Sequence, residues 1–507
     1  MVSEPKEQAS SKSALSGTSL PLAAVLFLAL LLALGMAATR LVAPNEGWFA
    51  DPAFHLETRG FFGTTIIEST HTWLEGVDRH TYWILPLYPL ALAPLFRAFG
   101  FSLYTMRALS IFWFLVAISA FYLLMRAQAG RGAALLATLL LAVDFHFLVG
   151  AAVGRMDMMC AALGYSAIAA YMLLRERSLH LAIFTSSTLA MAGCLTHPCG
   201  ILAVAGLISF AIRYDRERLS WSALALAVTP CLVGLGAYGA YAMQDFPGFV
   251  RQLTGNVSGV AGEATGSTRF AGLRHPLDAL RRELLDRYMS AFNGDSWTNP
   301  YRTQLIVLAL YWGGVIVALV DRRIRSQKAA RFLLPLAGIY FAILWIGEGL
   351  KLRVYMVHTL PLFAGLAALW IWNWTDGQRL LRASVIAVIL GIQFLGIGVG
   401  LWINQYHNEH LPAALYMQEH GQPGSLIMAS GQFAFEFGYD GRLVDDVRLG
   451  YFTGKKPEFF VRDVWYGEWL DRAKTREPKI YEHVSRTLAA EYREAFRNPG
   501  FVIYQKR

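Results

Sequence analysis

Long apolar stretches recur along most of the chain, and short charged turns separate them. The first covers about residues 20–38 and the last about 382–402. Apolar runs of about 18 residues or more are typical of helices that cross a lipid bilayer. A soluble protein can bury one such helix, but not about ten of them. The pattern therefore predicts a polytopic membrane protein.

We predict about eleven spans plus interfacial helices, which makes the fold mainly α. The segment 83–99 is also apolar, but Pro86, Pro89 and Pro94 interrupt it, so we expect it to lie at the membrane interface. A cleaved signal peptide is the alternative for 20–38, and its length favours an uncleaved span. The expected spans are 20–38, 105–125, 132–150, 157–174, 179–195, 198–212, 220–242, 304–320, 331–347, 354–373 and 382–402.

The basic residues sort the loops onto two sides of the membrane. Short loops rich in Lys and Arg face the cytoplasm, and long loops are largely exempt from that rule. The cytoplasmic side then receives Arg126, Arg131, Arg175, Arg177, Arg213, Arg216, Arg218, Arg322, Arg323, Arg325, Lys328, Arg379 and Arg382. The opposite side receives the first loop, the turn at 155–157, His197, the long loop, Lys351, Arg353 and the end of the chain. If 83–99 also crossed the membrane, the N-terminal tail and the later basic loops would lie on opposite sides.

The chain divides into three parts. Residues 1–19 are polar and Ser-rich and are expected to form a disordered cytoplasmic tail. Residues 20–404 form the membrane domain, with a first extracytoplasmic loop at 41–81 and a long one at 243–303. From 405 to 507 the chain is polar, and β-type runs alternate with charged helical stretches. This part is expected to be a small, soluble, extracytoplasmic α/β domain.

Composition excludes several classes of protein. The chain has 507 residues, 55% hydrophobic and 16% charged, with a net charge of +9. Such values exclude a disordered chain, a collagen-like fibre and a small disulfide scaffold. No basic stripe interleaves with exposed aromatic residues, so nucleic acid is not an expected partner. The excess positive charge is better explained by topology and by contact with anionic membrane lipids.

The extracytoplasmic side collects many polar groups close to the expected membrane boundary. Each of them alone is most often a solvated loop charge, but several separate helix ends deliver acids, histidines and bases to one side. Ionisable residues at membrane spans are costly and are therefore functional candidates. The set is Asn45, Glu46, Asp51, His55, Glu57, Asp157, His197, Lys351, Arg353 and His358.

This set has two chemical halves. The carboxylates Glu46, Asp51 and Asp157 suit proton transfer from a hydroxyl group or the binding of a divalent cation. The donors Lys351, Arg353, His358 and His197 suit a phosphate group. Together the halves indicate a substrate linked to a lipid phosphate and an acceptor that carries a hydroxyl group.

Five stretches, in order, resemble a known family. They are 44–51 (PNEGWFAD), 82–88 (YWILPLY) with Phe99-Gly100-Phe101 and Arg107 after it, 154–157 (GRMD), 195–198 (LTHP) and 349–361 (GLKLRVYMVHTLP). This pattern resembles the GT-C superfamily of glycosyltransferases, which use polyprenyl-phosphate sugars. It is most similar to the branch of protein O-mannosyltransferases and the aminoarabinose transferase of lipid A. The likeness covers about residues 20–400.

The resemblance implies an inverting transfer of a sugar from a polyprenyl-phosphate donor to a hydroxyl group of a lipid, glycan or protein. Members often carry Asp-Glu where this chain has Asn45-Glu46, and that Asp is the usual base. Glu46 is therefore the first candidate for the base and Asp51 the second, while Asp157 would orient the acceptor or the first loop. Metal dependence is left open, and Mg or Mn held by these three carboxylates is the form it would take.

The same resemblance implies a set of residues that bind the donor and its phosphate. Tyr82 would stack on a sugar ring, although aromatic residues also gather at membrane interfaces for other reasons. The set is Lys351, Arg353, Tyr355, His358, His197, Arg155 and Tyr82. The composition further favours a bacterial inner membrane, with the active site facing the periplasm or exterior.

Alternatives stay open at this point. A secondary transporter of an anionic or lipid-linked substrate also places ionisable residues in spans, but it usually shows internal repeats, and none is visible here. A receptor or scaffold would explain the last hundred residues but not the paired acids and bases. Asp144 and His146, inside one span, are expected to form helix–helix hydrogen bonds. An Arg-rich amphipathic segment at 277–292 either lies on lipid headgroups or caps the bundle.

Overall fold

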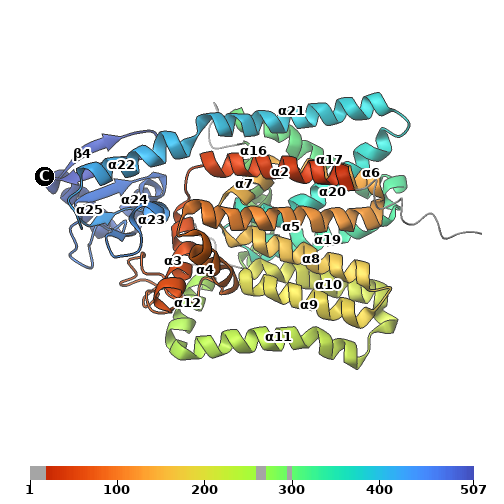
Figure 1. Ribbon diagram of the computed structural model, residues 1–507, viewed down its shortest axis with the longest axis horizontal. Coiled ribbons are helices and arrows are strands. Elements are labelled where there is room, and N and C mark those ends of the chain that lie inside the picture. The colour runs from red at the N-terminus through yellow and green to blue at the C-terminus, as the bar shows by residue number, and fades with distance from the viewer. Residues whose placement is uncertain (1–18, 259–269, 294–299) are drawn as a thin grey trace, which may run out of the picture.

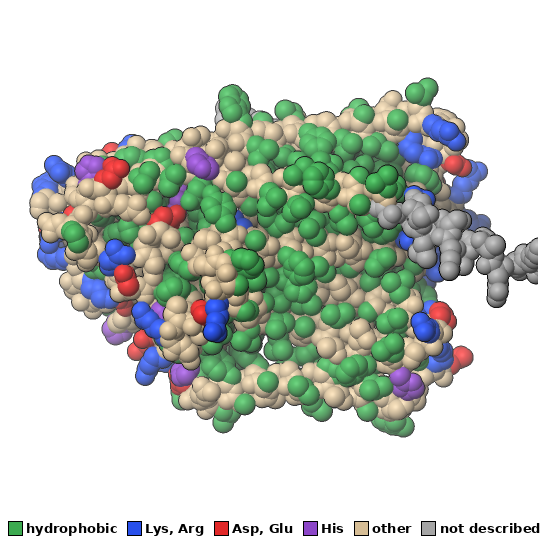
Figure 2. Space-filling model, in the orientation of Figure 1, with side chains coloured by type: hydrophobic (Ala, Val, Ile, Leu, Met, Phe, Trp, Pro, Cys, Tyr) green, Lys and Arg blue, Asp and Glu red, His purple; other side chains and the backbone are tan. Residues whose placement is uncertain are grey.

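The structure is a computed structural model that describes residues 19–258, 270–293 and 300–507. The predicted tail at 1–19 lies almost entirely outside this part of the chain. Helices run side by side in a long bundle, and a small domain with a sheet sits at one end of it (Figure 1). In Figure 2, apolar side chains cover the middle of the molecule and charged ones gather at its two ends. This is the surface of an integral, multi-pass membrane protein.

Eight helices in the described residues are long and apolar enough to cross a membrane. The predicted polytopic helical fold is therefore confirmed. Each predicted span corresponds to one of these helices, to a bent pair or to a shorter apolar helix, and the number that cross stays a prediction. The long helices include α2 (Ser19–Thr39), α5 (Leu103–Ala129), α8 (Met156–Leu174), α9 (Leu179–Thr196), α10 (Ile201–Asp215, which with the short turns on either side extends over Pro198–Arg218), α11 (Trp221–Ala242), α19 (Lys328–Gly347) and α21 (Arg379–Ile403), and the shorter ones are α17 (Gln304–Val320) and α20 (Leu360–Trp374).

One predicted span is broken in the middle. Helices α6 (Arg131–Ala142) and α7 (Phe145–Ala152) meet at an angle of 59°. Asp144 lies at the break, where its Oδ1 accepts from the Phe147 N–H at 2.8 Å and its Oδ2 accepts from the Tyr311 hydroxyl at 2.7 Å and from Gln393 Nε2 at 3.2 Å. The carboxylate thus caps α7 and links it to α17 and α21. These are the helix–helix hydrogen bonds expected for Asp144.

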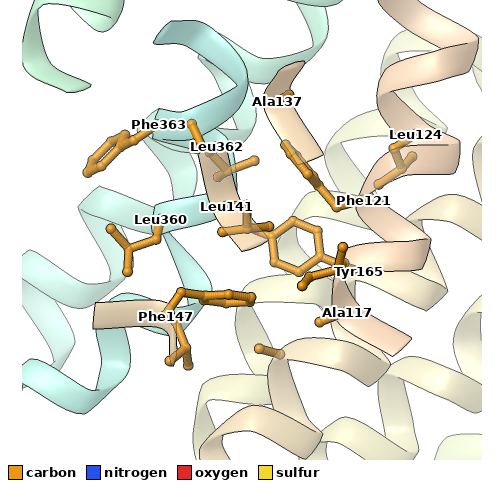
Figure 3. Packing of buried hydrophobic residues seen from close by; sticks show 14 of the residues in the cluster. Ala117, Phe121, Leu124, Ala137, Leu141, Phe147, Tyr165, Leu360, Leu362 and Phe363 are labelled. Carbon is orange, nitrogen blue, oxygen red and sulfur yellow. The ribbon is translucent and has the colours of Figure 1, made fainter. Parts of the chain in front are cut away.

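Small residues let the central helices approach closely. Alanines alternate with large side chains in the buried cluster, a composition typical of membrane helix interfaces. Figure 3 shows large side chains from four helices meeting around alanines: Phe121 and Ala117 of α5, Leu141 and Ala137 of α6, Tyr165 of α8, and Leu360 and Phe363 of α20. The packed interior holds fixed the helix ends that carry the polar residues.

Shorter elements cover the end of the bundle next to the small domain. Helix α4 has only 13 residues, or about 20 Å, and the apolar part of a bilayer is about 30 Å thick. It packs against α3, as expected for an interfacial helix. The elements at this end are α3 (Pro44–Arg59), α4 (Leu87–Phe99), α12 (Phe246–Ser258), α14 (Ala271–Arg274), α15 (Pro276–Arg282), a π-helical turn η4 (Glu283–Met289), α16 (Ser290–Asn293) and η6 (Arg353–His358).

The small domain follows α21 and contains a five-stranded sheet. Its strand order is β2-β1-β3-β5-β4, with β1, β2 and β3 parallel to one another and β5 antiparallel to β3 and β4. The strands are β1 (Ile427–Met428), β2 (Leu443–Val444), β3 (Phe459–Arg462), β4 (Tyr492–Arg497) and β5 (Val502–Lys506). The helices are α22 (Leu411–His420), α23 (Ala434–Phe437), α24 (Val464–Arg476) and α25 (Pro478–Glu491). The predicted α/β class of this region is confirmed.

Candidate active site

Glu46 lies in the first turn of α3 and is fully buried. Its Oε1 accepts from Arg107 Nε at 2.9 Å and from the Gly154 N–H at 2.7 Å. Its Oε2 accepts from Arg107 Nη2 and from the Ala43 N–H, both at 2.8 Å. Burial by itself would raise the pKa of Glu46, but the charge of Arg107 and these hydrogen bonds lower it below its usual value.

These bonds change what Glu46 can do. A carboxylate has about four lone-pair positions, and protein donors occupy them all. The geometry therefore disfavours Glu46 as the acceptor of a proton and gives it another task. It ties α3 to α5, through Arg107, and to the turn that begins α8, through Gly154.

Asp51 is held in a similar way, one turn and a half further along α3. Its Oδ2 accepts from the N–H groups of Thr65 at 2.6 Å and Ile66 at 2.8 Å, and His55 Nε2 lies 3.1 Å from its Oδ1. Burial raises the pKa of Asp51, and the bonds to His55 and to the backbone oppose that shift only in part. Asp51 is also fully buried, so its carboxylate serves to fold the first loop back onto α3.

Asp157 differs from both. It sits in the first turn of α8, and its Oδ2 accepts from Arg155 Nε at 2.7 Å. Its Oδ1 has no hydrogen-bond partner among the described residues, and His197 Nε2 lies 4.0 Å away. Of the three carboxylates predicted to act, Glu46, Asp51 and Asp157, only Asp157 has an oxygen without a hydrogen-bond partner in the described part of the chain.

Two histidines and a tyrosine lie around this free oxygen. His197, at the turn after α9, accepts from the Cys199 N–H through Nδ1 at 3.2 Å, which leaves the proton of a neutral ring on Nε2, toward Asp157. The rings of His197 and Tyr355 are 5.0 Å apart. The Nε2 atom of His358 is buried and has no hydrogen-bond partner in the described part of the chain. The structure therefore brings together Arg155, Asp157, His197, Tyr355 and His358.

The predicted phosphate ligand Lys351 is already paired. Its Nζ forms an ion pair with Glu283 Oε2 at 3.0 Å and donates to the carbonyl oxygens of Leu344 and Trp345 at 3.1 and 2.7 Å. Burial lowers the pKa of Lys351, and the charge of Glu283 opposes this shift. Its backbone has a φ of 56°, an uncommon value for a residue other than glycine.

Glu283 and Arg287 complete this buried ion-pair group, and sequence reasoning missed both. Arg287 Nε lies 3.0 Å from Glu283 Oε1, and its Nη2 lies 2.6 Å from Glu348 Oε2. Two acids and two bases balance one another. The segment 277–292 therefore caps the bundle here, rather than placing Arg287 on headgroups. The signal in the sequence is the i, i+4 spacing of Glu283 and Arg287 in an amphipathic stretch.

The remaining predicted residues lie apart from the Asp157 group. Arg353 is exposed, and its Nε donates to Ser290 Oγ at 3.0 Å. Tyr82 stacks on His80 and packs against Tyr241, beside an apolar pocket of about 290 Å³ that includes Phe62, Pro86, Leu195 and Tyr238 in its lining.

In the described residues, no three His, Cys, Asp or Glu side chains gather as they would around a metal ion, so Glu46, Asp51 and Asp157 do not form a common metal site.

Other polar atoms near this end of the bundle are buried without a hydrogen-bond partner among the described residues. Asn45 Oδ1, next to Glu46, is one of them, and the hydroxyl of Tyr88 in α4 is another. Unsatisfied buried polar atoms are rare and often belong to ligand sites. The sequence singled out Asn45, but nothing in it distinguished Tyr88 from an ordinary core tyrosine.

The chain was compared with known proteins. No family model and no curated protein matches it. Among solved structures it is similar to ArnT from Cupriavidus metallidurans bound to undecaprenyl phosphate, with a TM-score of 0.58 and 15% identity over 98% of each chain. It is also similar to the oligosaccharyltransferase AglB from Archaeoglobus fulgidus, in complex with an inhibitory peptide and a dolichol-phosphate. There the TM-score is 0.56 and the identity 12%, over 96% of this chain and 74% of that chain.

The chain has the GT-C fold of these proteins. The alignment over nearly the whole of both chains includes the small domain after α21 as well as the helix bundle. The fold expected from the ordered motifs is therefore confirmed.

Proposed function

We propose that this protein is a membrane-embedded inverting glycosyltransferase. It moves a sugar from a polyprenyl-phosphate donor to the hydroxyl group of a lipid, glycan or protein acceptor. The reaction takes place at the end of the bundle that carries the small domain, on the extracytoplasmic side. A bacterial inner membrane, with the site facing the periplasm, is the location we propose.

The observation that carries this proposal is the environment of Asp157. One of its oxygens is held by Arg155, and the other has no hydrogen-bond partner among the described residues and lies 4.0 Å from His197 Nε2, at the start of a helix. A fixed carboxylate with a free oxygen suits the binding of a hydroxyl group and the removal of its proton. The GT-C fold and the order of the five motifs support the same class of reaction.

The roles follow from this geometry. The acceptor hydroxyl donates to Asp157 Oδ1, which takes its proton as the acceptor oxygen bonds to the anomeric carbon. The bond between that carbon and the phosphate oxygen breaks, and the polyprenyl phosphate leaves with the electron pair. His197 and His358, next to Asp157, offer donors to the leaving phosphate, and preorganised donors of this kind are often the largest contribution to catalysis.

A divalent cation has no step in this proposal. The oxygens of Glu46 and Asp51 are occupied by protein donors, and no group of three metal-type side chains exists among the described residues. The residues present do not fit such an ion.

The test is sugar transfer by the purified protein in lipid vesicles. A panel of labelled undecaprenyl-phosphate sugars is offered, with native membrane extract as acceptor, to the parent, Asp157→Asn and Glu46→Gln. We expect transfer by the parent, loss of turnover with retained folding in Asp157→Asn, and a lowered stability in Glu46→Gln. A parent that neither transfers nor hydrolyses any sugar of the panel would overturn the proposal. A transport assay with the same lipids would then follow.

A further inference from the structure

The carboxylate of Asp445 is one of the groups that join the small domain to α3. Its Oδ2 accepts from the indole N–H of Trp48, in α3, and from the Gly431 N–H, both at 2.8 Å. Its Oδ1 accepts from the Tyr466 hydroxyl at 2.7 Å. One side chain therefore connects α3, the loop after β1 and helix α24.

The backbone of Asp445 adds a second connection to the first loop. Its N–H donates to the Ile66 carbonyl at 2.7 Å, and its carbonyl accepts from the Glu68 N–H at 3.1 Å. Ile66 is also the residue whose N–H binds Asp51. The first loop is thus held between Asp51, on α3, and Asp445, on the small domain.

The backbones of the two regions touch beside this carboxylate. A Cβ atom on Gly47 would lie 1.9 Å from the carbonyl oxygen of Gly431, so only glycine fits there. The Tyr439 hydroxyl donates to the Gly47 carbonyl at 2.6 Å. Such close contact leaves α3 little freedom to shift relative to the domain.

The other end of this connection is the Asp157 turn. Glu46, two residues before Trp48, binds the N–H of Gly154, and Asp157 follows three residues later. The line of contacts therefore runs from Asp445 through Trp48 and Glu46 to the turn that carries the unpaired oxygen. A displacement of α3 moves Asn45 and Glu46 relative to that oxygen.

We propose that Asp445 is a positioning residue for the reaction at Asp157, which it serves by fixing α3 through Trp48. This inference rests on the proposed function. It assigns the small domain a part in the geometry of the site, without contact to the reacting atoms. The parallel strands β1, β2 and β3 place Ser430, Asp445 and Asp463 together at their carboxyl ends, the edge at which α/β sheets present their polar residues.

The experiment uses the full chain in vesicles, with the undecaprenyl-phosphate sugar that gives transfer. The variants are Asp445→Ala, Asp445→Asn, Trp48→Phe and the double variant with Ala and Phe. The control is Asp471→Ala, which removes an exposed carboxylate of α24 that binds Lys474. We measure kcat, KM for the donor, the folded fraction and hydrogen exchange over α3.

We expect Asp445→Ala and Trp48→Phe each to lower kcat about 10- to 100-fold with little change in KM, because small displacements in a site cost that much. Asp445→Asn keeps most of the activity, since its amide oxygen still accepts from Trp48 and Gly431. The double variant is no worse than the more severe single one, because both remove the same bond. Exchange over α3 rises in Asp445→Ala and not in Asp471→Ala.

Two results would overturn the inference. One is a kcat that falls only in proportion to the folded fraction, since that makes Asp445 a purely structural residue. The other is unchanged exchange over α3 in Asp445→Ala. Failure of the proposed function is distinguishable: the parent would then transfer no sugar of the panel, while the exchange measurement would still decide whether Asp445 fixes α3.

Discussion

Glu46 and Asp157 are both buried carboxylates with an arginine partner, but they differ in how many hydrogen bonds the protein makes to them. Glu46 forms four hydrogen bonds, two of them to one guanidinium group, and keeps no oxygen for a ligand. Asp157 receives one hydrogen bond, from Arg155, and its Oδ1 accepts none from the residues that the structure describes. The comparison shows that burial and an arginine neighbour do not define a catalytic acid or base. The number of unused lone pairs separates the two carboxylates.

The cations of the site show the same contrast. Lys351 is buried and bound to Glu283 and two carbonyl groups, whereas Arg353 is exposed at the start of η6. Both belong to the same predicted motif. Only the structure reveals that one of them balances buried charge while the other reaches solvent.

The largest effect expected from this comparison is on turnover. Asp157→Asn should lower kcat about 10²- to 10⁴-fold, the usual contribution of a general base. Because the amide oxygen can still accept from Arg155, thermal unfolding in detergent should shift by only a few degrees. A variant with full turnover would show that Asp157 takes no proton.

Glu46→Gln should act on stability instead. It leaves the buried guanidinium of Arg107 without its counter-charge, at a cost of about 3–5 kcal/mol. Unfolding in denaturant measures this loss of stability. Glu57→Gln is the control, because Glu57 lies 3.9 Å from an exposed Arg97 and has no closer ion pair among the described residues. A Glu46→Gln protein as stable as the parent but inactive would return Glu46 to the role of base.

Gly47→Ala should weaken the contact between α3 and the small domain. The new methyl group would collide with Gly431, and overpacking of this kind costs about 1–3 kcal/mol. Gly236→Ala is the matched control, since a Cβ there meets open space. Limited proteolysis of the first loop reports the effect, and equal cleavage of both variants would contradict it.

The smallest effect concerns pH. Burial raises the pKa of Asp445 to about 6, and the bonds from Tyr466 and Trp48 oppose the shift while the charge of Asp463 adds to it. A carboxyl group with a raised pKa in the folded state stabilises fully below its unfolded value, near 4, and this contribution is lost as the pH rises through 6.

The stability of the parent relative to Asp445→Asn should therefore fall by about 1–2 kcal/mol between pH 4 and pH 7. Thermal unfolding of both proteins across this range measures the difference. A difference that stays constant with pH would show that Asp445 has an ordinary pKa.

The sequence predicted the fold well because membrane helices are encoded locally. Runs such as those of α5 and α21 are mostly apolar, and no distant residue is needed to recognise them. The break between α6 and α7 was missed, since a lone Asp144 inside an apolar run has many structural meanings. Its partners Tyr311 and Gln393 lie far away in the chain.

For the candidate site, the sequence predicted which residues lie at the same end of the bundle better than it predicted their contacts. The motifs identified Glu46, Asp157, His197 and His358, but the role of Glu46 depends on Arg107, 61 residues away, and on a backbone N–H at Gly154. How many lone pairs of a carboxylate are occupied by protein donors depends on the folded structure. Asp445 was missed altogether, because a pair of acids after a short strand resembles an ordinary turn.

The contact of Gly47 with the small domain has a consequence for biosynthesis. The hydrogen bond between Gly47 and Tyr439 joins residues 392 positions apart. Helix α3 is therefore synthesised long before the surface that receives it exists. Insertion of the helices into the membrane and formation of this contact are separate events, and the second waits for the synthesis of the small domain. A polypeptide stalled after α21 would hold its full set of membrane helices around an open first loop.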